Sequence, residues 1–318
     1  MVNELIGVMR ERIPKGSNLA NSLMEILCMG KEAIYRRLRG EVAFTFEEVS
    51  LISQHLGISL DKIVGRRMLN DTMFDLNLLH TGDPIESYYE ILVRYAKLFD
   101  LLRDDPTASV ATASNLIPFT FYSPYECLSK FRLGRWIYHH GKMKPPASLS
   151  DLQVPDKVPQ MHWKLSASIR QLSHTSFIWD YNIFRSIVKE IRYFAGLDLL
   201  SAEDVRNMKK ELGLLLSELE AVTMTGEFSK GHSLAIYLSD INFEATYTYV
   251  EKGDFQACLF RVYSINSMDS QNPRMCNIQK NWIQSLKRHS TLISQSSEIQ
   301  RRQFFNEQRE IVESLQEA

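Results

Sequence analysis

Four cationic side chains gather on one short stretch, residues 29–41, which reads MGKEAIYRRLRGE. They are Lys31, Arg36, Arg37 and Arg39. Only Glu32 and Glu41 offset them within this stretch. Arginine can form paired hydrogen bonds with guanine or hold a phosphate, and lysine adds a mobile charge. These residue types therefore offer the chemistry of nucleic-acid recognition.

A helix is the element that would present these side chains together. Ile34 and Leu38 are four residues apart and would pack inward, and a glycine at position 40 would end the helix. On a period of about 3.6 residues, the outward or exposed positions are Lys31, Glu32, Tyr35, Arg36 and Arg39. Tyrosine can contact a thymine methyl group or donate to a phosphate.

Short helices on both sides would hold this stretch in place, and residues 1–66 predict five helices with the cationic stretch on the third. Ser17 or Asn18 is the expected N-cap of the second helix. Thr45 and Glu48 have the spacing of a capping box at the start of the fourth. Because helix N-termini attract phosphates, we expect Asn18 and Thr45 to contact a DNA backbone.

The charge of the whole chain does not predict nucleic-acid binding, because the net charge is -1. Residues 1–67 contain ten Lys or Arg against eight Asp or Glu, and residues 31–39 contain four against one. Any binding therefore depends on a local patch, which is small for one copy of the chain. A second copy of the chain would double this patch, so we expect a homodimer.

The stretch LANSLMEILCMGKEAIYRRLRGEVAFTFEEVSLISQHLGISLDKIVG resembles the XRE, or lambda-repressor-like, helix-turn-helix family. The closing LGISLDKI is its most specific piece, and the resemblance covers about residues 3–66. It implies that the third helix lies in the major groove of double-stranded DNA. The family often has glutamine at the start of the second and third helices, and here those places lie near Asn18 and Lys31.

A different pattern follows residue 68, where the all-helical domain 1–68 is expected to end. Residues 74–78 alternate like a strand, residues 243–265 have the pattern of a hairpin around EKGD, and residues 201–222 predict an amphipathic helix. These patterns predict an α+β domain, 69–318, with an antiparallel or mixed sheet flanked by helices. The layout resembles regulators of Bacteroides-type bacteria, and the element order resembles PAS or GAF sensor domains.

Other kinds of site have no motif behind them. The chain has no GxGxxG, GxxxxGK[ST], HExxH or GxSxG sequence, and its four cysteines form no CxxC pair. We therefore assign no catalytic, cofactor or metal residues. No apolar run is long enough to span a bilayer and no signal peptide is recognisable, so we expect a cytoplasmic protein without a membrane partner.

These patterns favour a sequence-specific DNA-binding transcriptional regulator, whose residues 69–318 hold a dimer together, sense a small-molecule effector, or do both. The alternative is an interaction scaffold whose helix-turn-helix module docks a partner protein. Clustered cations on a helix are also typical of an ordinary solvated face, and only the order of the five helices favours DNA. An enzyme is the third alternative, with no motif to support it.

Overall fold

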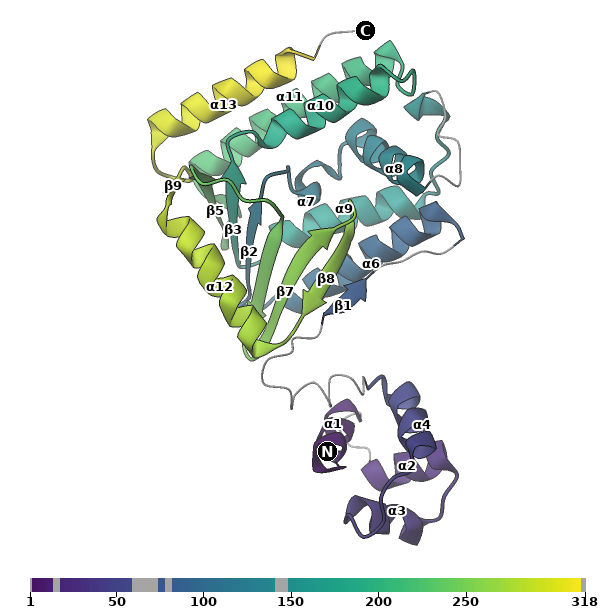
Figure 1. Cartoon of the computed structure of the whole chain (residues 1–318). Coiled ribbons are helices and arrows are strands. Elements are labelled where there is room, and N and C mark those ends of the chain that lie inside the picture. The colour runs from purple at the N-terminus through teal and green to yellow at the C-terminus, as the bar shows by residue number, and fades with distance from the viewer. Residues whose placement is uncertain (1, 14–17, 59–73, 78–81, 141–147, 316–318) are drawn as a thin grey trace. The chain divides into compact units, whose positions relative to one another are not determined.

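The structure is a computed structural model that describes residues 2–13, 18–58, 74–77, 82–140 and 148–315. The chain divides into two compact units, Met1–Met73 and Phe74–Ala318 (Figure 1). The boundary expected after residue 68 and the fifth helix expected from residue 59 lie outside the described residues. None of the described helices combines the length and the apolar character that crossing a bilayer requires.

The smaller unit is helical, as its sequence predicted. Its described helices are α1 (Val2–Arg12), α2 (Leu19–Leu27), α3 (Lys31–Leu38) and α4 (Phe46–Leu56). Met9, Leu23, Ile34 and Ile52 come from these four helices and form a fully buried cluster. The inward face of each helix follows from apolar residues spaced three and four apart, because these positions share one side of a helix.

Local hydrogen bonds begin and end these helices as the sequence predicted. The Asn18 side chain accepts from the backbone N–H of Ala20 at 2.9 Å, so Asn18 is the N-cap of α2. Thr45 and Glu48 form a capping box at the start of α4. Gly57 ends α4 with φ 62°, a left-handed conformation that glycine adopts without strain.

A mixed nine-stranded sheet forms the centre of the larger unit. Its strands are β1 (Asp75–Asn77), β2 (Ser109–Ser114), β3 (His174–Asp180), β4 (Glu227–Ser229), β5 (His232–Ser239), β6 (Tyr247–Lys252), β7 (Phe255–Val262), β8 (Asn266–Ser270) and β9 (Ser290–Leu292). Their order is β1-β8-β7-β6-β2-β3-β5-β4, with β9 also paired to β5.

The sheet combines two kinds of pairing. β2, β3 and β5 are parallel, and β6, β7, β8 and β1 continue from β2 as antiparallel strands. Parallel neighbours need a crossover connection, so the chain between β2, β3 and β5 is long and helical. The predicted hairpin is confirmed: β6 and β7 pair from Tyr247 opposite Phe260 to Lys252 opposite Phe255.

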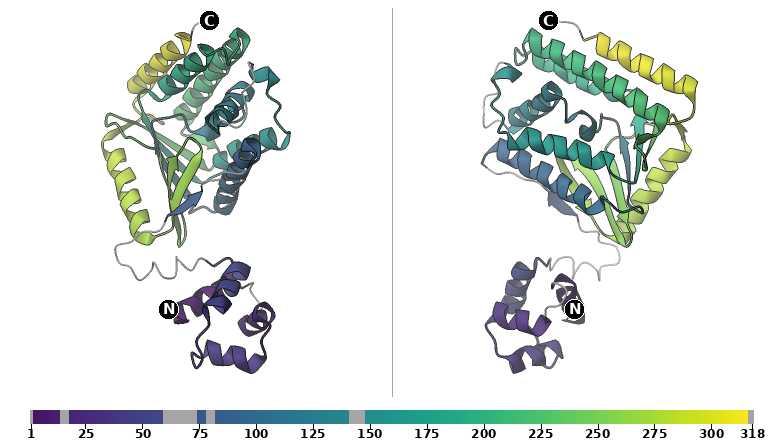
Figure 2. Two further views of the ribbon diagram at one scale, coloured as in Figure 1. Left: turned by 45° about the vertical axis from the view of Figure 1, so that its right-hand side comes forward. Right: turned by 180° about the vertical axis from the view of Figure 1, so that it is seen from behind.

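Helices cover both faces of this sheet, as Figure 2 shows. The helices are α6 (Pro84–Leu102), α7 (Phe119–Tyr122), α8 (Glu126–His140), α9 (Lys157–Arg170), α10 (Ile183–Ala195), α11 (Ala202–Thr225), α12 (Pro273–Arg288) and α13 (Glu298–Glu313), with a short 3-10 turn at Leu149–Asp151. α12 packs alone on one face, and the other helices contribute to the main core. Phe177 and Trp179 on β3 join that main core, whereas Ile178 between them faces α12.

Two helices of this unit begin at positions that their local sequence does not predict. The apolar spacing of residues 161–172 favours a helix, and α9 covers most of it but already begins at Lys157. Pro159 lies in the first turn of α9, where no hydrogen bond needs its missing N–H. Asp180 is of a residue type that caps helices, yet Asn182 is the N-cap of α10 and donates its backbone N–H to Asp180 at 2.6 Å.

Candidate nucleic-acid interface

The orientation of α3 is set by its buried face. Ile34 is fully buried between Leu23 of α2 and Ile52 of α4, and Leu38 is partly buried against the same cluster. Cys28 adopts a left-handed conformation with φ 50°, which ends α2 and lets the chain turn into α3 within three residues. The opposite face of α3 is therefore directed to solvent.

Most of the residues predicted for DNA contact lie on exposed surface. They are Asn18, Lys31, Glu32, Arg36, Arg39 and Thr45. Tyr35 differs, because it is partly buried and packs against the core of the unit, with the Lys31 Nζ 5.9 Å from its ring centroid. The Tyr35 ring thus packs against the Lys31 side chain. Less of the tyrosine is exposed to solvent than the helical period alone predicted.

Acidic side chains hold two of the exposed arginines. Arg39 Nε donates to Glu41 at 2.6 Å, and its Nη2 lies 3.4 Å from Glu32. Arg36 Nε lies 3.6 Å from the other oxygen of Glu41. The hydrogen bond from Arg39 lowers the pKa of Glu41, so this carboxylate stays charged near neutral pH. Exposed ion pairs of this kind contribute little to stability, so a phosphate can replace the carboxylates as the partner of Arg36 and Arg39.

Arg37, the fourth cation, has a different role. It turns away from solvent, with Nε and Nη2 donating to the two oxygens of Glu48 at 2.9 and 2.8 Å. Glu48 also accepts the backbone N–H of Thr45 at 2.9 Å, so one carboxylate caps α4 and binds α3 to it. In the sequence Arg37 is one of four clustered cations, and its contact with Glu48 was not predicted. The signal was its position three residues after the buried Ile34, which places it beside the inward face.

The cationic face is therefore weaker than the bare count of arginines implied. Three of the four cations on residues 31–39 form ion pairs with Glu32, Glu41 or Glu48. Counting these three carboxylates against the four cations leaves a local charge of +1 (four minus three). Lys31 is the cation that makes no ion pair with another described residue. Lys31 is thus ready to meet a phosphate, and Arg36 and Arg39 must first leave their carboxylates.

The described residues contain no group of three or more His, Cys, Asp or Glu side chains that is arranged to hold a metal ion. No family model matches the chain, and no curated protein or solved structure is significantly similar to it. A function for this chain is therefore inferred from the residues of α3 and their surroundings.

Proposed function

We propose that this protein is a sequence-specific DNA-binding transcriptional regulator of the XRE-like helix-turn-helix type. The observation that carries this proposal is the solvent-directed face of α3. Lys31, Arg36 and Arg39 lie on it, and the buried Ile34 fixes its orientation against α2 and α4. A rigid helix with a cationic outer face is the element that reads a major groove in such proteins.

Each residue of the face has a role in this proposal. Arg36 and Arg39, released from Glu41, read base edges or hold phosphates, and Lys31 adds charge at the N-terminal end of α3. Glu32 can accept a hydrogen bond from a cytosine amino group. Tyr35 packs beneath Lys31 and contacts a phosphate or a thymine methyl group.

Asn18 and Thr45 complete the proposed contact with the DNA backbone. Both are exposed N-caps, of α2 and of α4, so free backbone N–H groups and the positive ends of two helix dipoles lie next to them. Because the local charge of one copy is small, the protein acts as a homodimer on two half-sites. The larger unit holds the dimer or senses an effector, and the protein works in the cytoplasm.

Fluorescence anisotropy with the full chain tests this proposal. The probe is a duplex from the region upstream of its own gene, with scrambled DNA as control, at several salt concentrations. Arg36→Ala should weaken specific binding by about 1–3 kcal/mol if Arg36 reads a base. Arg10→Ala removes an exposed cation from α1 and is the matched control, with a smaller expected effect.

The scaffold alternative makes the opposite prediction. It is favoured by the near-neutral charge of the α3 face, which suits a protein partner as well as DNA. Binding to random duplex DNA with no dependence on salt would favour the scaffold, because phosphate contacts must release counterions. Unchanged operator binding by the Arg36→Ala variant would remove Arg36 from the interface.

A further inference from the structure

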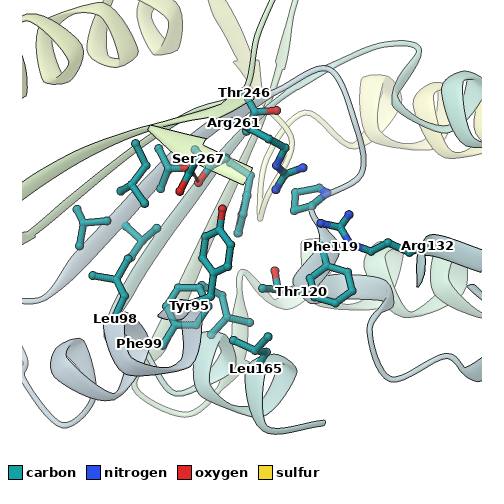
Figure 3. Close-up of a pocket in the computed structure, with 18 residues that line it drawn as sticks. Tyr95, Leu98, Phe99, Phe119, Thr120, Arg132, Leu165, Thr246, Arg261 and Ser267 are labelled. Carbon is teal, nitrogen blue, oxygen red and sulfur yellow. Dashed lines mark hydrogen bonds between the residues drawn. The ribbon is translucent and has the colours of Figure 1, made fainter. Parts of the chain in front are cut away.

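A cavity of about 80 Å³ lies within the larger unit, between the sheet and the helices of the main core (Figure 3). Strands β2, β6 and β7 line one side, and helices α6 and α9 line the other. Phe99, Leu165 and Phe177 make much of this lining apolar. Two guanidinium groups, of Arg132 and Arg261, reach into it from α8 and β7.

Arg132 is buried but only partly satisfied. It is 8% exposed, and its guanidinium carbon lies 4.1 Å from the centroid of the Phe119 ring. Its Nη1 donates to the hydroxyl of Tyr122 at 2.9 Å, whereas its Nε has no hydrogen-bond partner among the described residues. A buried charged donor without a partner costs free energy, so the polar contacts of this cavity are incomplete.

Arg261 brings a second positive charge to the same cavity. Burial lowers the pKa of Arg261, and the charge of Arg132 lowers it further because the two cations repel each other. Tyr95 lines the same cavity and partly offsets this lowering of the Arg261 pKa. Neither arginine forms an ion pair with a carboxylate of the described residues. Arg132 is buried and Arg261 is partly buried. Two neighbouring cations in such a place are unfavourable unless an anion joins them.

We infer that this cavity binds a small organic acid, with its carboxylate between Arg132 and Arg261 and its apolar body among the phenylalanine and leucine side chains. The planar fork of a guanidinium matches a carboxylate with two parallel hydrogen bonds. Inorganic phosphate is a poorer match, because the remaining walls would offer it mainly carbon atoms.

A second cavity lies next to the first. It measures about 200 Å³ and shares four lining residues with the first: Tyr95, Leu98, Leu259 and Ser267. The inference concerns the larger unit by itself and does not require DNA binding. Only the further step, that this acid is the effector, rests on the proposed function.

Isothermal titration calorimetry of the full chain tests the inference with hexanoate as the probe. The neutral analogue hexanamide has nearly the same shape, so it isolates the contribution of the charge. Hexanoate should bind at least about ten-fold more tightly than hexanamide, because charge-assisted hydrogen bonds are the stronger ones. Inorganic phosphate, titrated separately, should bind more weakly than hexanoate.

Substitutions identify the residues that hold the carboxylate. Arg261→Met should weaken hexanoate binding about ten-fold or more, and Arg261→Lys should retain part of the affinity. Arg261→Met should leave the melting temperature unchanged or raise it, because one of two repelling charges is removed. Arg135→Met is the control for the loss of an arginine outside the cavity. Like Arg132, Arg135 is on α8 and lies over a phenylalanine ring, 5.7 Å from the centroid of Phe131, but it pairs with Glu190.

Specific outcomes would overturn the inference. Equal affinity for hexanoate and hexanamide, or full hexanoate affinity in Arg261→Met, would show that the arginines do not hold an anion. Tighter binding of phosphate than of hexanoate would exclude the organic acid. Mass spectrometry of the unfolded protein identifies any acid that co-purifies, which would support the inference. With no such acid present, failure of hexanoate to bind would exclude the site, whatever the protein does with DNA.

Discussion

The guanidinium group of Arg37 holds both carboxylate oxygens of Glu48, and the same carboxylate closes the capping box of α4. The two side chains are only 14% and 10% exposed. A paired hydrogen bond of this kind fixes direction as well as distance. The contact therefore couples the orientation of α3 to the start of α4, and it removes one of the four cations from the proposed DNA interface.

Removing Arg37 should loosen the smaller unit. Arg37→Ala leaves the Glu48 carboxylate without its partner, and we expect a loss of about 1–3 kcal/mol in local stability. Hydrogen exchange of the full chain should show faster exchange in peptides from α3 and α4. Arg36→Ala is the control, because Arg36 is exposed and makes one long contact, 3.6 Å from Glu41. Equal protection in both variants would contradict a structural role for Arg37.

Neutralising Glu41 should strengthen DNA binding. This carboxylate engages Arg36 and Arg39 in the free protein. Glu41→Gln therefore releases Arg36, leaves Arg39 with its longer contact to Glu32, and removes one negative charge from the interface. We expect binding about two- to five-fold tighter at low salt, and a smaller gain at high salt. Glu25→Gln removes an exposed carboxylate from α2 as a control. Anisotropy titrations that give the same affinity for both variants would exclude a restraining role for Glu41.

Asp204 should be important for the stability of the larger unit. It is 6% exposed and closes the capping box of α11 with Ser201. It also accepts hydrogen bonds from the Ser148 hydroxyl at 3.0 Å and from the Leu149 backbone at 3.1 Å. Asp204→Ala removes the acceptor that these hydrogen bonds share, so we expect the free energy of unfolding to fall by about 1–3 kcal/mol.

Tryptophan fluorescence during urea unfolding measures this effect, because all four tryptophans of the chain lie in the larger unit. Glu203→Ala is the matched control, since Glu203 is the exposed neighbour of Asp204 in the same first turn. A loss in Glu203→Ala as large as in Asp204→Ala would assign the effect to helix charge and not to the hydrogen bonds.

The stability of the larger unit should depend on pH through His162. Burial, followed by the charge of Arg132, lowers the pKa of His162 to about 3. An unfolded histidine has a pKa of about 6.5, so below that pH the unfolded chain binds a proton that the folded chain does not. The contribution of neutral His162 to the free energy of unfolding is complete above about pH 6.5 and is lost as the pH falls toward 3.

Between pH 7 and pH 4.5 this one group should lower the free energy of unfolding by about 2–3 kcal/mol. His162→Gln should reduce that pH dependence in urea titrations. His174→Gln, at an exposed position of β3, should leave it unchanged. The assignment fails if the wild type and His162→Gln lose the same free energy over this pH range.

Local patterns predicted those features of the chain whose hydrogen bonds close within a few residues. The capping box at Thr45 and the hairpin of β6 and β7 are examples. Each depends on neighbours in sequence, so residue type and spacing are enough to predict it. The buried position of Ile34 followed in the same way from the helical period.

The last helix shows where such patterns leave a choice open. Phe304 and Gln308 share one face of α13, and Leu315 follows just after its end. In sequence this spacing suits either the core of the same chain or a second subunit. In the structure all three are buried within the larger unit, and Gln308 Nε2 donates to the carbonyl of Tyr181 at 2.8 Å. The amphipathic pattern of α13 predicts that its apolar face is buried, but it does not predict whether the same chain or a second subunit buries it.

By itself the sequence determined the helical smaller unit, the α+β character of the larger one and the cations on α3. Only the tertiary structure decided which of those cations are engaged, because Glu48 meets Arg37 from another helix. The parallel centre of the sheet was decided there too, since pairing between distant strands carries no local signal. Arg132 and Arg261 reach one cavity for the same reason: long-range strand order and helix packing bring a helix and a strand together.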